Sequence, residues 1–400
     1  MTPPIKTSVP PKRGLTGYFA PISTTGEKCR AFVPNPLPPT PAISLDAETQ
    51  SLMEQASLAV GRLDGLSAVL PDTSAFLYSY VRKEAVLSSQ IEGTQSTLSD
   101  LLLFESEATP GVPLEDVQQV SNYVAALNRG LERLREGIPI SLRLIKELHA
   151  ILLSKGRGRG KEPGEFRRSQ NWIGGSRPGN ATFVPPPPDL LLECLGPWEK
   201  FLHEEPKKMP LLIKAALAHV QFETIHPFLD GNGRIGRLLI TLLIYSEGAL
   251  REPTLYLSLH FKQHRDQYYD LLQRVRTHGE WEAWLQFFFT AVRESAETAS
   301  NTARRLMKLG CDDERRVAKL GRAAGTALRL HRYLQTRPIS TIGAASTRLS
   351  LSVPTITSAF NHLQRLGIVQ ELTGQARSRI YAYKEYLSVL GDDRAPDETR

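Results

Sequence analysis

A polar run of twelve residues leads without a break into a mostly apolar stretch, and this junction restricts the fold more than any other feature of the chain. The polar run is HPFLDGNGRIGR at positions 226–237, and LLITLLI follows it. A continuous apolar stretch is buried in a folded protein, while glycine and asparagine suit the loop that precedes a helix. The junction therefore predicts a loop that opens onto a buried helix.

The predicted helix start is suited to binding phosphate. The backbone N–H groups of Gly231, Asn232 and Gly233 would lie at the helix N-terminus, where donors are unsatisfied and the helix dipole favours anions. Arg234 and Arg237 are three residues apart, so they share one helix face and can bind the same polyphosphate. The pattern indicates a site for a polyphosphate.

Two side chains before this helix supply the remaining chemistry. Asp230 can hold Mg²⁺ while phosphates supply the other oxygen ligands, and His226 is a candidate general base. The alternative is a polar helix cap with a buried histidine and surface arginines, which gives no reason for Gly-Asn-Gly beside two arginines. A Walker A loop is disfavoured, because the run contains no Gly-Lys-Ser/Thr.

The run matches HPFx(D/E)GNGRxxR at every defined position, and in this it resembles the signature of the Fic family. The resemblance implies transfer of a nucleotide moiety, usually AMP from ATP with Mg²⁺, to a hydroxyl of a target protein. It makes His226 catalytic and Asp230 the metal ligand. A kinase-like variant has lysine in place of Gly233, so this glycine favours AMP transfer. The ATP-binding residues implied in the motif are Gly231, Asn232, Gly233, Arg234, Gly236 and Arg237.

A second motif lies far upstream, in the sequence SSQIEGT. Ser88, Glu92 and Gly93 fit (S/T)xxxE(G/N), which resembles the inhibitory motif of Fic proteins whose inhibitory helix precedes the catalytic domain. The resemblance implies that Glu92 pairs with Arg237. A carboxylate there would occupy the γ-phosphate site, so ATP would bind with its α-phosphorus out of line for attack. The alternative is an ordinary helix end with a solvent-exposed glutamate.

Residues 164–188 resemble the Fic flap, a β-hairpin over the active site that aligns the target segment by backbone pairing. Within it, Thr182, Phe183, Val184 and Pro185 fall where the family's flap meets nucleotide and substrate. The prolines have another interpretation, as a rigid linker or a ligand for a proline-binding module.

Tyr268 and Tyr269 resemble the family region that closes the adenine pocket. The alternative is core packing, which we expect for the aromatic residues that follow, Trp281, Trp284, Phe287 and Phe288. His219 lies on an apolar helix, and we expect it to be a core residue rather than a metal ligand.

The periodicity of the chain predicts a mainly α fold: a Fic-type helical core with a β-hairpin flap, preceded by a helical region and followed by a winged helix. The expected domains are a proline-rich extended arm at 1–42, a helical region with the inhibitory helix at 43–112, the catalytic domain at 113–305 and the winged helix at 320–390. The expected helices before the tail are 46–70, 74–90, 117–136, 141–153, 190–203, 210–221, the motif helix, 261–272 and 281–309.

The tail reads as three helices and a two-stranded wing, which is the winged-helix pattern. Basic residues outnumber acidic ones there, and Arg377 and Arg379 lie where a wing would contact a phosphate backbone. DNA contact is one interpretation, and a protein-docking or dimerisation module is the other. The expected elements are helices at 328–336, 341–349 and 352–366 and strands at 367–372 and 378–383.

Composition adds limits rather than a function. The net charge of +7 is weak evidence for a nucleic-acid partner, and the three cysteines show no CxxC spacing, which fits a reducing cytosol. No signal peptide is evident, and the apolar runs are too short to span a bilayer. We therefore expect a cytoplasmic protein with no membrane partner.

Two function classes follow. The first is an AMP-transferring enzyme inhibited by Glu92, and removal of AMP from a modified target stays open. The second is an ATP-sensing, DNA-binding regulator that uses the winged helix. The sequence leaves open the target protein, modification of the chain itself, and whether the protein is a homodimer.

Overall fold

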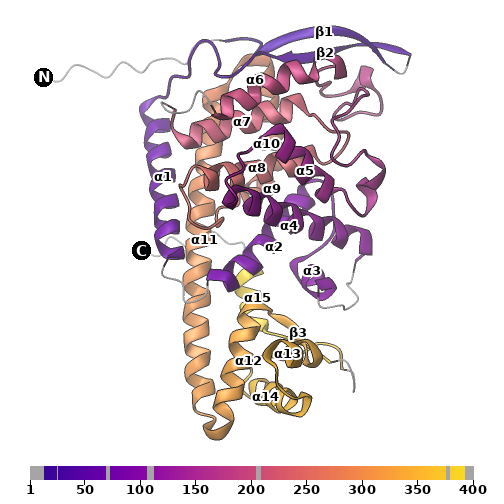
Figure 1. Cartoon of the computed structure of the whole chain (residues 1–400). Coiled ribbons are helices and arrows are strands. Elements are labelled where there is room, and N and C mark those ends of the chain that lie inside the picture. The colour runs from indigo at the N-terminus through magenta and orange to yellow at the C-terminus, as the bar shows by residue number, and fades with distance from the viewer. Residues whose placement is uncertain are drawn as a thin grey trace, which may run out of the picture.

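A computed structural model describes residues 13–24, 26–68, 73–105, 112–203, 209–374 and 379–391. Helices dominate it, and one long helix, α11, runs from the larger part of the molecule into a smaller part at the C-terminal end (Figure 1). We call the larger part the main body and the smaller part, made of residues 324–391, the C-terminal body. The mainly α fold class predicted from the sequence is confirmed.

The helices of the main body are α1 (Ala47–Ser67), α2 (Thr73–Ile91), α3 (Leu98–Glu105), α4 (Leu114–Arg135), α5 (Leu142–Leu152), α6 (Leu191–His203), α7 (Leu211–Ile225), α8 (Asn232–Ser246), α9 (Ser258–Gln263), α10 (Arg265–His278) and α11 (Trp281–Ala318). The C-terminal body contains α12 (Ala324–Thr336), α13 (Ile342–Leu349), α14 (Val353–Arg365) and α15 (Lys384–Gly391). The strands are β1 (Gly17–Thr24), β2 (Glu27–Pro34), β3 (Ile339–Thr341), β4 (Gln370–Glu371) and β5 (Ile380–Ala382).

Helices α7 and α8 form the centre of the main body. Both are buried along most of their length, because apolar residues surround them on all sides. Helix α8 packs against α2, α4, α5 and α7, and the indole N–H of Trp284 on α11 donates to Ala216 O on α7 at 3.0 Å. This packing holds α8, the predicted motif helix, with its N-terminus next to the loop that leaves α7. We call residues 226–231 the motif loop.

The N-terminal segment differs from its prediction as an extended, proline-rich arm. Residues 17–34 form an antiparallel hairpin of β1 and β2, with Gly26 at φ 78° in the turn. The amide of Phe32 in β2 donates to Val184 O at 2.8 Å, so the hairpin lies against the segment predicted to be the flap. The prolines dominated the sequence pattern, and the hydrogen bond from Phe32 to Val184 joins segments far apart in the chain, which leave no local signal. Residues 1–12 lie outside the described residues.

The described part of the C-terminal body has four helices and a three-stranded antiparallel sheet in the order β3-β5-β4. Strand β3 and helix α15 were not predicted, and the two expected strands are shorter than their predicted ranges. The winged-helix interpretation stays a prediction. Arg377, the expected phosphate contact, lies outside the described residues.

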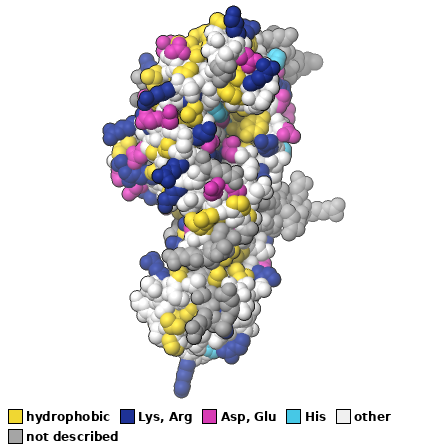
Figure 2. Space-filling view, turned by 90° about the vertical axis from the view of Figure 1, so that its right-hand side faces the viewer, with side chains coloured by type: hydrophobic (Ala, Val, Ile, Leu, Met, Phe, Trp, Pro, Cys, Tyr) yellow, Lys and Arg dark blue, Asp and Glu magenta, His cyan; other side chains and the backbone are white. Residues whose placement is uncertain are grey.

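Charged side chains of both signs are mixed over the face of the molecule seen in Figure 2, without a large area of one sign. Among the described residues, no helix is both long enough and apolar enough to cross a membrane.

Candidate active site

The motif loop is held in shape by its own asparagine. His226 ends α7 in the left-handed conformation, at φ 49° and ψ 61°, and Gly231 precedes α8 at φ 81°. The Asn232 side chain accepts a hydrogen bond from Phe228 N at 2.8 Å and donates to Phe228 O at 2.8 Å. Only the backbone amide of Asn232 is therefore left to bind a ligand.

The start of α8 has the features of an anion site. The amides of its first turn lack an intrahelical acceptor, and the side chains of Arg234 and Arg237 are only 4% and 2% exposed. Asp230 lies at the rim with 43% of its side chain exposed, where its Oδ1 accepts from Gly231 N at 2.6 Å. The residues predicted from the motif are thus brought together around one helix N-terminus.

The carboxylate of Glu92 lies over this helix N-terminus. Its Oε1 accepts a hydrogen bond from Arg237 Nη2 at 2.7 Å, and a Cβ built on Gly233 would lie only 2.3 Å from the same oxygen. Ser88 adds two bonds, with its Oγ accepting from Arg237 Nε and its carbonyl from Nη2, both at 2.9 Å. Gly93, at φ 93°, follows the end of α2. Ser88 and Glu92 therefore hold Arg237 through three hydrogen bonds.

The Glu92–Arg237 contact favours the charged form of both groups. Burial opposes ionisation of Glu92, but the Arg237 guanidinium outweighs it and holds the pKa of Glu92 below its ordinary value. Burial opposes the charge of Arg237 in turn, and the Glu92 carboxylate raises its pKa nonetheless. The pair is ionised at neutral pH, so the site holds a negative charge where a phosphate would bind.

His226 is neutral at physiological pH. Burial lowers the pKa of His226 to about 3, and the cations of Arg276 and Arg167 act in the same direction. A neutral imidazole can accept a proton, and a bound polyphosphate would raise its pKa by adding negative charge.

His149 of α5 also contacts the motif loop, although no motif in the sequence marks it. Its Nδ1 accepts from Gly164 N at 2.9 Å, so the proton is on Nε2, which donates to Asp230 O at 2.9 Å. The imidazole stacks on Phe228 with ring centroids 3.7 Å apart. Burial lowers the pKa of His149 to about 4, which keeps this tautomer neutral. A lone histidine on an amphipathic helix carries no sequence signal for this contact.

Glu223 of α7 is a second residue that the sequence reasoning missed. It is 6% exposed, and its Oε1 has no hydrogen-bond partner in the described part of the chain. Burial raises the pKa of Glu223 to about 7. A Cβ on Gly236 would lie 2.2 Å from this oxygen, so Gly236 permits the close approach of α7 to α8. The structure gives Gly236 this packing role, and its predicted contact with ATP stays a prediction.

The predicted flap contains a single β-bridge, between Ile173 and Phe183, rather than two regular strands. Val184 O is taken by the amide of Phe32 from β2, and Thr182 is exposed. The guanidinium of Arg276 on α10 lies 3.9 Å from the centroid of the Phe183 ring. The predicted flap is therefore held by a hydrogen bond from β2 and by the contact of Arg276 with Phe183.

Further polar contacts hold the predicted flap together and join α10 to the end of α7. Pro185 O accepts from Gln170 Nε2 at 2.9 Å. Arg276 Nε donates to Thr224 Oγ1 at 3.1 Å and its Nη2 donates to Glu223 O at 3.3 Å, both near the end of α7. The same cation thus contacts the flap and the turn of helix that precedes His226.

The two tyrosines of α10 lie in different surroundings. Tyr268 is 1% exposed and its hydroxyl lies 2.9 Å from His219 Nε2 in the core, whereas Tyr269 keeps 37% exposure. Of the two, Tyr269 has the surface that an adenine contact requires. The tyrosine contacts with adenine remain predictions.

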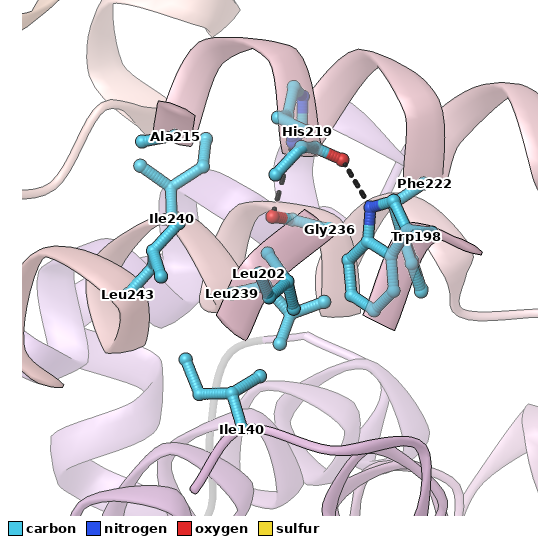
Figure 3. Close-up of a pocket in the computed structure, with 11 residues that line it drawn as sticks. Ile140, Trp198, Leu202, Ala215, His219, Phe222, Gly236, Leu239, Ile240 and Leu243 are labelled. Atoms are coloured by element: carbon cyan, nitrogen blue, oxygen red, sulfur yellow. Dashed lines mark hydrogen bonds between the residues drawn. The ribbon is translucent and has the colours of Figure 1, made fainter. Parts of the chain in front are cut away.

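An apolar pocket lies under α8, away from the motif loop, and is lined by side chains of α6, α7 and α8 (Figure 3). His219 Nδ1 donates to Gly236 O at 3.1 Å across one side of it, and the Trp198 indole donates to Ala218 O at 2.9 Å. The side chains of His219 and Trp198 are thus hydrogen-bonded within the core, as expected for His219 from the sequence. Gly236 is the one predicted site residue among the residues that line this pocket.

No group of three or more His, Cys, Asp or Glu side chains that could hold a metal ion occurs among the described residues. Asp230 is a single, half-exposed carboxylate beside the amides of α8. This arrangement fits Mg²⁺, which commonly takes one or two protein carboxylates together with substrate phosphates and water.

Comparison with known proteins identifies the class. Residues 139–244 match the model of the Fic/DOC family, and residues 50–132 match the model of the Fic/DOC family N-terminal region. The chain therefore contains a domain of the Fic/DOC family, as the motif predicted. It has the family's N-terminal region directly before its Fic domain.

Two curated relatives named protein adenylyltransferase Fic illustrate the similarity. The protein from Aedes aegypti is 33% identical over 233 residues, which cover 56% of this chain and 43% of the relative. That from Drosophila grimshawi is 29% identical over 278 residues, 68% of this chain and 53% of the relative. The chain spans about half the length of these relatives.

Solved structures show the same fold. A Fic family protein from Desulfovibrio desulfuricans G20 has a TM-score of 0.55 at 18% identity, covering 85% of this chain and 97% of that one. Fic-1 (residues 134–508) from C. elegans has a TM-score of 0.51 at 23% identity, covering 66% of this chain and 74% of that one.

Proposed function

We propose that this protein is a protein adenylyltransferase, which transfers AMP from ATP to a Ser, Thr or Tyr hydroxyl of a target protein and is inhibited by Glu92. The observation that carries the proposal is the convergence at the start of α8 of free amides, two buried arginines and a neutral histidine. The similarity to relatives named protein adenylyltransferase Fic supports it.

In this proposal the α- and β-phosphates bind over the first-turn amides of α8, and the distal phosphates bind Arg234 and Arg237. Asp230 holds Mg²⁺, which supplies neutralising charge to the phosphates when bound. His226 Nε2 or Nδ1 accepts the proton of the target hydroxyl. The hydroxyl oxygen forms a bond to the α-phosphorus, the bond from that phosphorus to the bridging oxygen breaks, and pyrophosphate leaves.

The proposed inhibition has a direct physical cause. The Glu92 carboxylate is 2.7 Å from Arg237, the side chain that would bind a distal phosphate, and two anions cannot share one guanidinium edge at low cost. Glu92 keeps 38% of its side chain exposed, so it lies at the mouth of the site, where a shift of α2 can remove it. Activity is therefore expected to be low until Glu92 moves away.

The test compares three proteins with α-labelled ATP, Mg²⁺ and bacterial lysate: wild type, Glu92→Gly, and Glu92→Gly with His226→Ala. We expect labelled protein only with Glu92→Gly, because that variant alone has a free Arg237 and a base. Retained labelling in the double variant would remove His226 from its role. Equal labelling by wild type and Glu92→Gly would contradict the inhibition.

A parallel reaction with γ-labelled ATP separates AMP transfer from phosphorylation, because only the α-label stays on the product of AMP transfer. Incubation of purified product with Mg²⁺ and no ATP then tests whether wild type also removes AMP. A labelled band at the size of the chain itself would show self-modification.

We also propose a partner for the C-terminal body, either DNA or a second copy of the chain, and a cytoplasmic location on the ground of the reducing-type cysteine usage. A gel-shift titration separates the partners. DNA binding should weaken steeply as salt rises, because phosphate contacts release counterions, whereas sedimentation without DNA reports a homodimer.

A further inference from the structure

Arg167 is a buried cation at the centre of the site. The residue is 2% exposed, and its guanidinium donates to three backbone carbonyls. Nε donates to His226 O at 2.9 Å, and Nη2 donates to Pro186 O at 2.5 Å and to Ile225 O at 3.4 Å. Its Nη1 is buried and has no hydrogen-bond partner within the described ranges.

No carboxylate contacts Arg167 in the part of the chain that the structure describes, so its charge is not neutralised by an ion pair. Burial lowers the pKa of Arg167 to about 10, which leaves the group protonated at neutral pH. A buried, unpaired cation is energetically costly, and a neutral side chain would fill the same space at a lower cost. The position of this charge therefore needs a reason other than packing.

The three carbonyls explain what Arg167 holds. Ile225 and His226 end α7, where carbonyls lack intrahelical donors, and His226 has the left-handed backbone that only glycine adopts without strain. The backbone amide of Arg167 also donates to Pro227 O at 3.0 Å. Successive peptide groups around His226 are thus fixed by one residue, which sets the direction of its side chain.

The same guanidinium connects the flap to this turn, because Pro186 directly follows the flap residues 182–185. Arg167 itself lies in the flap segment, before the bridge residue Ile173. One side chain therefore determines where the catalytic histidine lies relative to the hairpin that would present the target.

We propose that Arg167 is a positioning residue, which holds the His226 imidazole toward the flap-bound hydroxyl. This proposal rests on the proposed function for its catalytic consequence, but its effect on His226 is measurable without catalysis. The Arg167 side chain is assigned no contact with the nucleotide.

The charges around His226 define the expected effect. Arg276 on α10 and Arg167 disfavour the imidazolium, while the Glu92 carboxylate and the carbonyl of Glu223 favour it. Removal of the Arg167 charge should therefore raise the pKa of His226, with Arg276 and burial still acting in the opposite direction.

The kinetic test uses the Glu92→Gly background and replaces Arg167 by Met or Lys. We expect Arg167→Met to lower kcat by about 100-fold, the usual effect of a misplaced base, with KM for ATP changed by less than about threefold. Arg167→Lys keeps the charge but cannot bind three carbonyls, so its kcat should lie between those of the Glu92→Gly parent and Arg167→Met. The matched control is the neighbouring Arg168→Met, because Arg168 is exposed.

The second test records His226 by NMR in the same proteins without nucleotide, as a titration of its imidazole signals. We expect an upward shift of the His226 pKa and a mixture of tautomers in Arg167→Met, and a pKa near that of the parent in Arg167→Lys. This titration needs no AMP transfer. It can therefore contradict the role of Arg167 independently of the proposed adenylyltransferase activity.

Three results would overturn the proposal. One is a kcat for Arg167→Met within threefold of the parent. Another is unchanged His226 signals in that variant. The third is a fall in kcat matched by loss of ATP binding and of cooperative unfolding, which would make Arg167 a structural residue only.

Discussion

Two glycines of the motif are required by side chains that approach from other helices. A Cβ on Gly233 would collide with the Glu92 carboxylate of α2, and one on Gly236 would collide with Glu223 of α7. The glycines of the motif therefore permit close packing, in addition to the proposed phosphate binding. Only one of these approaches, that of Glu92, follows from the sequence resemblance.

His149 offers a prediction at the same scale. His149→Phe keeps the stacking on Phe228 but removes the bonds with Gly164 N and Asp230 O. We expect a loss of roughly 1–3 kcal/mol in the free energy of unfolding, because two buried polar groups lose their partners. We also expect a several-fold higher Mg²⁺ concentration for half-maximal AMP transfer in the Glu92→Gly background.

Urea unfolding and a Mg²⁺ titration of the rate measure these effects. The control is His278→Phe, since His278 is exposed. A destabilised variant with an unchanged Mg²⁺ requirement would limit His149 to a role in the core.

At the scale of elements, α2 is the helix that links the predicted inhibitory motif to the core. Glu84 and Ser88 are four residues apart, so they share one face of α2, and Glu92 follows the last residue of this helix. Glu84 is 2% exposed and accepts hydrogen bonds from Ser258 Oγ at 2.5 Å and Tyr123 OH at 3.3 Å. This face of α2 is therefore polar but buried, unlike an ordinary amphipathic helix.

Glu84 leads to a prediction about pH. Burial raises the pKa of Glu84 to about 7, above its value in the unfolded chain, so the folded state binds the proton more tightly. Its contribution to stability is fully present below about pH 4.5 and is lost as the pH rises through about 7. The free energy of unfolding of the wild type should therefore fall by an amount on the order of 2–3 kcal/mol as the pH rises through this range. We expect this fall to be absent in Glu84→Gln.

Urea unfolding at pH 5, 6 and 8 measures this slope. Glu223 has a raised pKa of about 7 for the same reason, so Glu223→Gln serves as the comparison and the two effects should add. An identical pH slope in wild type and Glu84→Gln would show that Glu84 keeps its ordinary pKa.

At the scale of the whole molecule, the C-terminal body contacts α2, the helix that precedes Glu92. Lys83 Nζ on α2 donates to Leu390 O of α15 at 2.7 Å, and the Arg337 guanidinium lies 3.7 Å from the centroid of the Tyr78 ring. A separate apolar cluster joins α3 to the small sheet, and its buried members are Leu102, Ile339 and Ala382. Apolar side chains are visible at the surface between the two bodies in Figure 2.

This contact predicts an effect of distant substitutions on activity. Ile339→Asp places a charge in the apolar cluster and should loosen the C-terminal body from α2 and α3. We expect AMP transfer to rise several-fold when Glu92 is present, because α2 loses support and Glu92 leaves Arg237 more often. No rise is expected in the Glu92→Gly background.

Initial rates of the single and double variants form the test, with the exposed Gln364→Asp on α14 as the control. Equal stimulation with and without Glu92 would show that the cluster acts elsewhere than on inhibition.

The sequence by itself determined the features written in consecutive residues. The motif at 226–237 specified the loop, the helix and the family, and helical periodicity located most helices, because both depend on neighbours along the chain. The position of a helix end before Gly93 also followed from local chemistry.

Only the tertiary structure decided which distant groups meet at the site. Arg167, His149 and Glu223 have no recognisable local pattern, since their partners are backbone atoms and glycines of other elements. The contact of the 17–34 hairpin with Val184 and the contact of the C-terminal body with α2 likewise join residues that lie far apart in the sequence. Such contacts are selected by the packing of whole elements, which no short stretch of sequence encodes.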